Sequence, residues 1–489
     1  MIFSSIVFIF FFLPIVLVVF HSLRKSLRFP FLLLSSLFFY FFGENYLIWI
    51  MLTTIVVDYF SGLLIAGGLN QKPIVQLIPN GHRSNLQKFW LTVSIISNLS
   101  LLGFFKYFNF FTDNIIQVLD LLHLSHLKLD GLVKISLPLG ISFYTFQSMS
   151  YTIDVYRGHV AANRNFIKFA TFVTMFPQLV AGPIVRYSEI DKQLNNHTIK
   201  FDQFVEGIQR FIIGLAKKVL IANTLGKIAD QIFLINSNEL PTIIAWIGIL
   251  AYSLQIYFDF SGYSCMAIGL GKMFGFEFSE NFNYPYISTS IKEFWRRWHI
   301  SLSTWFRDYL YIPLGGSKGS GIKTYLNLFI VFSLCGLWHG ASWNFLIWGL
   351  FHGFFLSMER IGVEKWLHNF PKLFRHFYVL FFVSISWVFF RAETLSGSIE
   401  YLKSMFFYRT SDVLHISEFL QPNVLIAFAL GILFSTPLIP KFLTISKLLR
   451  PGLLYLSEIT YFSALFTLLL LSIMYLTSGS FNPFIYFRF

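Results

Sequence analysis

The sequence predicts an all-α polytopic membrane protein, and three observations lead to this fold class. Of the 489 residues, 55% are hydrophobic, 20% are aromatic and only 12% are charged. A soluble domain of this length needs far more charge to cover its surface, whereas lipid-facing helices need almost none. The mean hydropathy is +0.63. Apolar stretches long enough to cross about 30 Å of hydrocarbon as helices recur along the whole chain.

These apolar stretches predict where the membrane helices lie. They cover residues 2–22, 29–43, 46–68, 89–111, 133–155, 166–184, 241–258, 325–345, 346–358, 376–391, 423–440 and 459–478. Stretches 29–43 and 346–358 are short for a span, so we expect little tilt, a locally thinned bilayer or re-entrant segments there. The first stretch lacks the basic region and the cleavage site of a secretory signal, so we interpret it as an uncleaved helix.

Basic residues predict the orientation of the chain in the membrane. Lys and Arg follow the first, third and fifth stretches, as Arg24, Lys25 and Arg28, then Lys72, Arg83 and Lys88, then Arg157, Arg164 and Lys168. Because positively charged loops stay in the cytoplasm, we expect an external N-terminus. The formal net charge is +13. The excess lies in loops and helix ends, where anionic lipid accounts for most of it, so no nucleic-acid partner is predicted.

Cysteine usage argues against a metal centre. Cys265 and Cys335 are isolated, each inside an apolar stretch. Two such thiols form neither a disulfide framework nor a zinc cluster, and we interpret them as small buried hydrophobes. The sequence shows no metal motif and no phosphate-binding Walker loop. We therefore expect no metal and no permanently bound cofactor.

Two regions depart from simple apolar spans. In residues 201–225 apolar side chains recur at helical spacing with charged ones between them, which predicts a helix in the membrane interface or along a wet cavity. An ordinary bundle helix with a polar seam is the alternative. Residues 277–323 interleave aromatic and basic side chains, as is typical of the headgroup boundary, and predict re-entrant or interfacial helices.

Carboxylates at membrane depth, together with helix breakers, suggest a lined cavity. Asp58, Asp154 and Asp259 lie in apolar stretches, and Arg186 follows FPQLVAGPIV. Intramembrane charges usually face a cavity or one another, and structural pairing is the commoner explanation. Of the three, Asp259 is the one we expect nearest a reaction centre. The Pro and Gly residues of LPLGISFYTFQ and FPQLVAGP predict broken helices.

Two histidines in aromatic surroundings, His299 and His339, are the candidate catalytic residues. Imidazole titrates near neutrality, so placing it among Trp, Phe and Leu suggests proton chemistry. Acyl transfer to a hydroxyl needs a general base, and a positioned His in this role commonly raises the reaction rate roughly 10²–10⁴-fold. The alternative for each is structural: a hydrogen-bonded core residue for His339, and an interfacial belt around His299. Small and polar neighbours favour the functional reading of His339, and they are Gly336, Gly340, Ser342 and Asn344.

A charged cluster surrounds His299 and is the candidate donor site. It consists of Arg296, Arg297, Arg307 and Asp308. Several hydrogen-bond donors within about three helical turns would suit the binding of an anionic acyl-group donor or of a negatively charged intermediate. His352 is interpreted as structural, because a straight helix would place it about 20 Å from His339.

Six segments in order resemble one family, the membrane-bound O-acyltransferases, and within it the bacterial alginate and peptidoglycan O-acetylation branch. They are LPLGISFYTFQSMSYTIDVYRG, FPQLVAGPIVRY, YFDFSGYSCMAIGLGKMFG, FWRRWHISLSTWFRDYLYIPLGG, GLWHGASWNFLIWGLFHG and FNPFIYFRF. The likeness covers nearly the whole chain and is strongest over 137–353. It implies one membrane domain over 1–489, a ring of about 11–13 transmembrane and re-entrant helices around a central tunnel.

The resemblance also implies roles. His339 is the active-site histidine of the family's WHG element, and His299 lies across the same tunnel. The sequence itself, and not the resemblance, suggests that Arg296, Arg297, Arg307, Asp308, Asp259 and Asn344 bind or support the donor. The implied function is an inner-membrane O-acetyltransferase component that uses acetyl-CoA and a polysaccharide acceptor, with a separate periplasmic acetyltransferase or relay protein completing the transfer. Transfer of D-alanyl or another acyl group, or a non-enzymatic transporter with a proton relay, are the alternatives.

Overall fold

The computed structural model describes residues 2–68, 76–124, 134–438, 451–479 and 481–483, and for 451–457 the backbone alone. Helices dominate these residues, which contain no strand. Six of the described helical segments are long and apolar enough to span a membrane, and they are Lys25–Ile65, Asn85–Leu121, Thr242–Met273, Gly321–His339, Lys372–Arg391 and Glu458–Thr477. The predicted class of all-α multi-pass membrane protein is confirmed, whereas the ring of helices around a tunnel stays a prediction.

The chain divides into two compact units. The first contains Val7–Phe204 and Gly271–Phe278, and the second contains Ile2–Ile6, Val205–Leu270 and Ser279–Phe489. The single functional domain expected over 1–489 stays a prediction.

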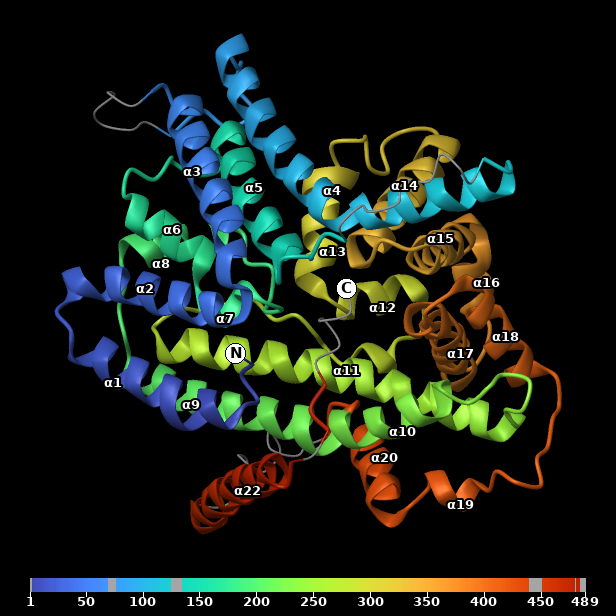
Figure 1. The fold of residues 1–489 in the computed structure, drawn as a ribbon. Helices are drawn as coiled ribbons and strands as arrows, with labels where there is room; N and C mark the ends of the chain where they lie inside the picture. The colour runs from blue at the N-terminus through green and yellow to red at the C-terminus, as the bar shows by residue number, and fades with distance from the viewer. Residues whose placement is uncertain (1, 69–75, 125–133, 439–450, 480, 484–489) are drawn as a thin grey trace. The chain divides into compact units, whose positions relative to one another are not determined.

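The first unit is built on a three-helix contact. Its elements are η1 (Phe8–Phe12), α1 (Leu13–Ser22), α2 (Lys25–Glu44), η2 (Asn45–Leu47), α3 (Ile48–Ile65), α4 (Asn85–Leu121), α5 (Ile141–Arg157), α6 (Phe166–Thr174), α7 (Phe176–Leu179) and α8 (Tyr187–Asn195). Helix α3 packs on both α4 and α5 (Figure 1). Asp58 of α3 is fully buried in this contact and accepts hydrogen bonds from Ser94, Asn98 and Ser148. The Asp58 carboxylate is thus held by uncharged hydrogen-bond donors that join α3 to α4 and α5.

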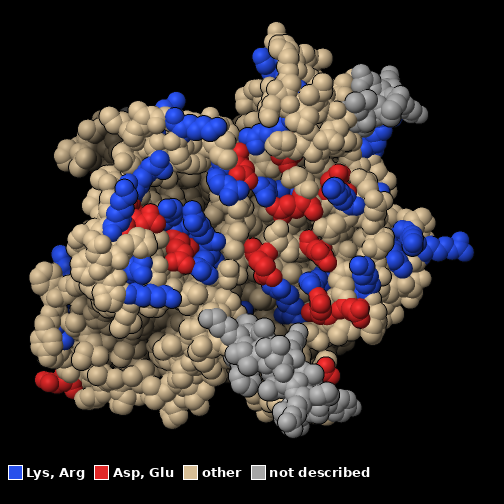
Figure 2. All heavy atoms as spheres, turned by 180° about the vertical axis from the view of Figure 1, so that it is seen from behind, with Lys and Arg blue, Asp and Glu red and all other residues tan. Residues whose placement is uncertain are grey.

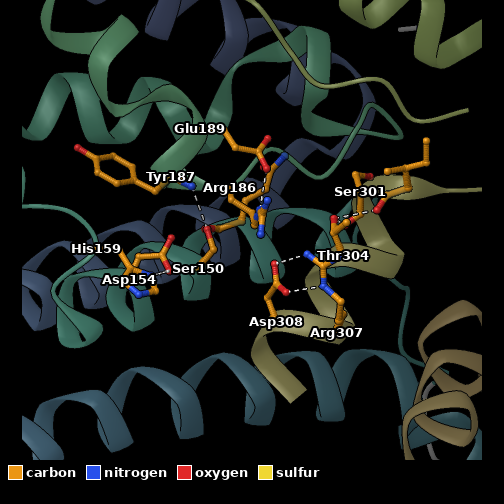
Figure 3. A network of polar contacts seen from close by, with 12 residues as sticks. Ser150, Asp154, His159, Arg186, Tyr187, Glu189, Ser301, Thr304, Arg307 and Asp308 are labelled. Atoms are coloured by element: carbon orange, nitrogen blue, oxygen red, sulfur yellow. Dashed lines mark hydrogen bonds and ion pairs between the residues drawn. The ribbon is translucent and has the colours of Figure 1, made fainter. Parts of the chain in front are cut away.

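Proline and glycine break the helices of this unit as predicted. Helix α5 begins only at Ile141, after Gly140, whose φ is 74°. A Cβ on Gly140 would lie 2.7 Å from the carbonyl oxygen of Leu179, so this close approach requires glycine. The apolar stretch 166–184 is interrupted at the predicted break, because α6 ends at Thr174 and only the short α7 follows it. Asp154 and Arg186, the two other charged residues of this unit that the sequence analysis singled out, also have partners. Asp154 lies beside His159, and Arg186 pairs with Glu189 (Figure 3).

The second unit carries the remaining helices. They are α9 (Phe201–Ala216), η4 (Lys217–Ala222), α10 (Asn223–Phe233), α11 (Thr242–Met273), η5 (Pro285–Ile287), α12 (Ile291–Arg297), α13 (Ile300–Phe306), η6 (Arg307–Tyr311), α14 (Gly321–His339), α15 (Trp343–Met358), η7 (Glu359–Val363), α16 (Glu364–Leu367), α17 (Lys372–Arg391), α18 (Leu395–Phe406), α19 (Ile416–Phe419), α20 (Pro422–Phe434) and α22 (Pro451–Thr477). A few end residues of α9 and α11 belong to the first unit.

Glycines bring α9 and α11 into close contact. A Cβ on Gly214 would lie 2.6 Å from the carbonyl oxygen of Gly262, and one on Gly269 would lie 2.6 Å from that of Gly207. Small residues at such contacts are typical of helices packed within a membrane bundle. The contact favours the bundle helix, the second of the two alternatives for residues 201–225.

Helices α14 and α15 form a hairpin, side by side in Figure 1. The expected spans 325–345 and 346–358 are wrong in their boundary, since α14 ends at His339 and α15 begins at Trp343. Gly340 between them is extended, with φ −167° and ψ 150°. His339 is therefore the last residue of α14 and lies next to the turn that connects the two helices.

Candidate active site

His339 lies in an aromatic box at the C-terminus of α14. The side chain is buried, with only 4% exposed. Its ring centroid lies 5.0 Å from that of Trp338, 5.1 Å from that of Trp348 and 5.2 Å from that of Phe390. All three neighbours meet the imidazole nearly edge to face. Close packing of this kind restricts the rotamers of the histidine and excludes bulk water.

His299 lies at the junction of α12 and α13 in an unusual backbone conformation. Its φ of 43° and ψ of 55° are left-handed, a region that non-glycine residues seldom occupy and that is common at functional sites. The side chain is completely buried. Burial lowers the pKa of His299, which lies outside the six candidate spans, well below its usual range. The resting imidazole is therefore neutral.

Asn281 sets the tautomer of His299. The Oδ1 atom of Asn281 lies 3.1 Å from Nδ1 of His299 and also accepts hydrogen bonds from the backbone N–H and the hydroxyl of Ser301. Its Nδ2 atom donates to the hydroxyl of Ser264 at 3.1 Å. Because the Ser301 N–H can only donate, the atom facing His299 is the oxygen, and Nδ1 of His299 carries the proton. Nε2 is then an acceptor, and no described residue hydrogen-bonds to it.

The two histidines lie close together. Their ring centroids lie 6.3 Å apart, and both rings contact Trp338. The structure thus brings the histidines of the two motifs close together, and that they form one catalytic site stays a prediction. Which histidine does what stays a prediction.

Two of the three predicted donor-binding arginines are engaged by neighbours. Arg297 pairs with Glu293 at 2.9 Å and donates to the backbone oxygen of Asn283. Arg307 pairs with the adjacent Asp308 at 2.7 Å (Figure 3). Basic and acidic side chains are likewise intermixed on the face drawn in Figure 2. Arg296 is exposed, and no ion pair of its side chain occurs among the described residues.

Arg296 lies on the rim of two cavities. One, of about 510 Å³, is mainly apolar and is lined by residues such as Trp295, Ile300, Phe306, Val331 and Cys335. Ile300 follows His299 in the sequence and Cys335 lies one helical turn before His339, whereas neither histidine itself lines this cavity. The other cavity, of about 480 Å³, is polar and includes Arg297, Arg375, Glu293 and Glu364. Lys292 and Arg296 line both.

The remaining predicted residues, Asp259 and Asn344, are both buried. Asp259 is buried and pairs with Lys218 at 2.5 Å, while its neighbour Phe260 contacts the His299 ring at 4.6 Å. Asn344 is buried in the first turn of α15, and its Nδ2 atom donates to the backbone oxygen of Ala392 at 2.7 Å. It ties α15 to the end of α17.

His352 has the structural role expected of it, but for a different reason. Its Nδ1 atom accepts from Nε1 of Trp295, and its Nε2 atom faces the hydroxyl of Ser386, both at 3.2 Å. The straight helix assumed between the two histidines is wrong because the chain turns after His339. The ring of Trp348 lies between them, 5.1 Å from His339 and 5.0 Å from His352.

Sequence reasoning missed two residues that hold the site. Asn281 is one, and the other is Glu359, whose carboxylate accepts from the backbone N–H groups of Ile291 and Lys292 at 2.6 and 3.0 Å. Glu359 thereby caps α12, the helix that leads to His299. Its place directly after an apolar helix was the available signal. Among the described residues no group of three or more His, Cys, Asp or Glu is arranged to hold a metal ion.

Comparison with known proteins identifies the family of the chain. Residues 157–399 match the model of the membrane-bound O-acyltransferase family. The chain is 41% identical to a probable alginate O-acetylase of Azotobacter vinelandii over the full length of both chains. It is 36% identical to a peptidoglycan O-acetyltransferase of Helicobacter pylori, over 86% of this chain and 82% of that one. It is 32% identical to a teichoic acid D-alanyltransferase of Bacillus subtilis, over 47% of this chain and 60% of that one.

Proposed function

The chain belongs to the membrane-bound O-acyltransferase family, and on this premise we propose that it is the O-acetyltransferase component of a bacterial inner membrane. It takes an acetyl group from a cytoplasmic donor, acetyl-CoA, and passes it to a hydroxyl of an extracytoplasmic polysaccharide or of a periplasmic relay protein. Acyl transfer and the multi-pass membrane location follow from the family and the six apolar helices. The donor, the acceptor and the orientation are the proposed part.

The observation that carries the proposal is the buried histidine pair, 6.3 Å apart beside an apolar cavity with a basic rim. A thioester of coenzyme A has an apolar acyl-bearing arm and anionic phosphates. The apolar cavity suits the arm, and Arg296 with Lys292 suits the phosphates. No bound cofactor is required, since the donor is consumed as a substrate.

In the proposed reaction His339 is the general base. The hydroxyl oxygen of the acceptor bonds to the acyl carbon, the carbon–sulfur bond of the thioester breaks, and the hydroxyl proton passes through the imidazole to the leaving thiolate. His299 in its observed tautomer accepts at Nε2. It therefore suits a role in orienting the acceptor hydroxyl, because polarising the donor carbonyl would require a proton on Nε2.

The test is the ester-linked acetate of cell-surface polysaccharide and of peptidoglycan, isolated separately from cells carrying wild type, His339→Ala, His415→Ala or no gene. His415 is an exposed histidine far along the chain from the site and serves as the matched control. Acetate on one polymer that disappears without the gene and with His339→Ala, but persists with His415→Ala, supports the proposal and identifies the final acceptor. Unchanged acetate on every polymer, with His339→Ala protein inserted at normal levels, rejects it.

Transfer of D-alanine is the second candidate, because the Bacillus subtilis relative is named for that reaction. Its likeness covers about half of this chain, whereas the acetylase likeness covers all of it. Alkaline hydrolysates of the same isolated polymers, assayed for both D-alanine and acetate, distinguish the two reactions. The family assigns acyl transfer to the chain, so transport by a proton relay is not proposed.

A further inference from the structure

The C-terminal segment FNPFIYFRF resembles the family, yet the proposed reaction gives it no task. Its first residues lie inside the second unit. The Oδ1 atom of Asn482 accepts from the Ser4 hydroxyl and from Nδ2 of Asn223, each at 3.2 Å, and its Nδ2 atom donates to the Ser4 carbonyl at 3.1 Å. Ser4 and Asn223 are both buried. One amide side chain thus joins the two ends of the chain to the start of α10.

The next residue reaches a buried ion pair. The carbonyl oxygen of Pro483 accepts a hydrogen bond from Nζ of Lys218. Lys218 lies in the π-helical turn η4 and pairs with Asp259 at 2.5 Å, and side-chain exposure is 1% and 2% respectively. A buried ammonium group requires an acceptor for each N–H, because it has lost its water. The C-terminal backbone supplies one of these acceptors.

Helix α11 connects this ion pair to His299. Asp259 is followed directly by Phe260, whose ring contacts the His299 ring edge on at 4.6 Å. About one turn later, the Ser264 hydroxyl accepts from Nδ2 of Asn281, the residue that fixes the His299 tautomer. Any shift or rotation of α11 at Asp259 therefore moves both supports of His299.

We propose that the segment Phe481–Pro483 is a clamp that positions α11, and through it His299, by holding the Lys218–Asp259 pair. In this role Lys218, Asp259 and Asn482 are positioning residues, and Asp259 acts at a distance from the acyl group. The inference rests on the proposed function only in that acetyl transfer serves as one of its readouts.

The first experiment separates positioning from stability at the ion pair. Lys218→Met alone leaves the Asp259 carboxylate buried without its counter-charge, so the amount of folded protein falls. Lys218→Met combined with Asp259→Leu removes both charges, and the folded amount recovers. Acetyl transfer from labelled acetyl-CoA is then measured in membranes over a range of donor concentrations. We expect kcat of the double variant to remain at least tenfold below wild type, with KM within about twofold; recovery of kcat together with folding would overturn the clamp.

The second experiment does not depend on activity. Asn482→Ala releases three hydrogen bonds of the clamp, whereas Thr477→Ala, at the exposed end of α22, removes only a bond within that helix. We expect carboxypeptidase Y to digest past Pro483 at least tenfold faster in Asn482→Ala protein than in wild type and Thr477→Ala protein. Equal rates for all three proteins would overturn the clamp. If wild type shows no acetyl transfer, the proposed function is rejected. The proteolysis rates still test the clamp, because they do not depend on activity.

Discussion

Nδ1 of His299 lies at a hydrogen-bond distance of 3.1 Å from Oδ1 of Asn281, and this contact determines which ring nitrogen carries the proton. The same amide oxygen accepts hydrogen bonds from Ser301, which lies in the first turn of α13. Asn281 therefore fixes the tautomer and the backbone position of the histidine together. Residues that orient a metal-bound histidine in other proteins contribute about 10–100-fold to activity, and we take the same range for Asn281.

We expect Asn281→Ala to lower the rate of acetyl transfer about 10–100-fold for this reason. The backbone N–H and hydroxyl of Ser301 also lose their acceptor, which costs about 1–3 kcal/mol of stability. Asn281→Asp keeps an acceptor oxygen for both partners and should retain more activity than alanine. The measurement is product acetate per amount of inserted protein. A rate for Asn281→Ala equal to wild type would show that the ring needs no such support.

Glu359 caps α12 across a long sequence separation. Its carboxylate accepts from the N–H groups of Ile291 and Lys292, which the helix itself leaves unpaired. We expect Glu359→Ala to lower the free energy of unfolding by about 0.5–2 kcal/mol, as loss of a cap does. Glu359→Gln keeps an acceptor and should lose less. Thermal unfolding of the purified proteins in one detergent compares them, and equal midpoints for alanine and wild type would contradict the capping role.

Glu293 predicts a pH dependence of stability. Burial raises the pKa of Glu293, but hydrogen bonds from Thr289 and the Arg297 guanidinium outweigh it and place the pKa below the ordinary value of 4.5. A lowered folded-state pKa stabilises the fold above the unfolded-state pKa, and this contribution disappears as the pH falls through the folded-state value. We expect wild type to exceed Glu293→Gln in thermal stability from pH 7 to about pH 5, and the difference to shrink below about pH 4.5. A difference that grows on acidification would contradict this assignment.

Arg296 is the arginine that we expect to contact the donor. Arg297 and Arg307 already pair with carboxylates, whereas Arg296 lies exposed on the rim of both cavities. We expect Arg296→Ala to raise KM for acetyl-CoA about tenfold, or about 1.4 kcal/mol, with little change in kcat. Arg360→Ala, an exposed arginine outside both cavities, is the control. An equal effect of the two substitutions would point to general charge rather than to a donor contact.

The sequence was sufficient for the features that are local. His299 and His339 were identified from their own motifs, and the helix breaks near Gly140 and Pro177 from residue type. Contacts between distant segments were not predictable, because one sequence does not show which helix faces which. Lys218 and Asp259, or Glu359 and Ile291, become neighbours only through packing. Helix α11 extends beyond the predicted 241–258 because its polar residues, such as Asp259, are buried in protein and not exposed to lipid.

The hairpin of α14 and α15 leads to a last prediction, on the position of His339. A Cβ on Gly336 would collide with the backbone carbonyl of Phe345, which cannot rotate away, so Gly336→Ala must separate the two helices one turn from His339. We expect a loss of about 1–3 kcal/mol in stability, and a larger proportional loss of acetyl transfer because the histidine moves with its helix. Gly353→Ala is the matched control, since its Cβ would meet the nearest side-chain atoms at 3.4 and 3.5 Å, an ordinary contact. If both variants keep wild-type activity per folded molecule, the spacing of this hairpin does not position His339.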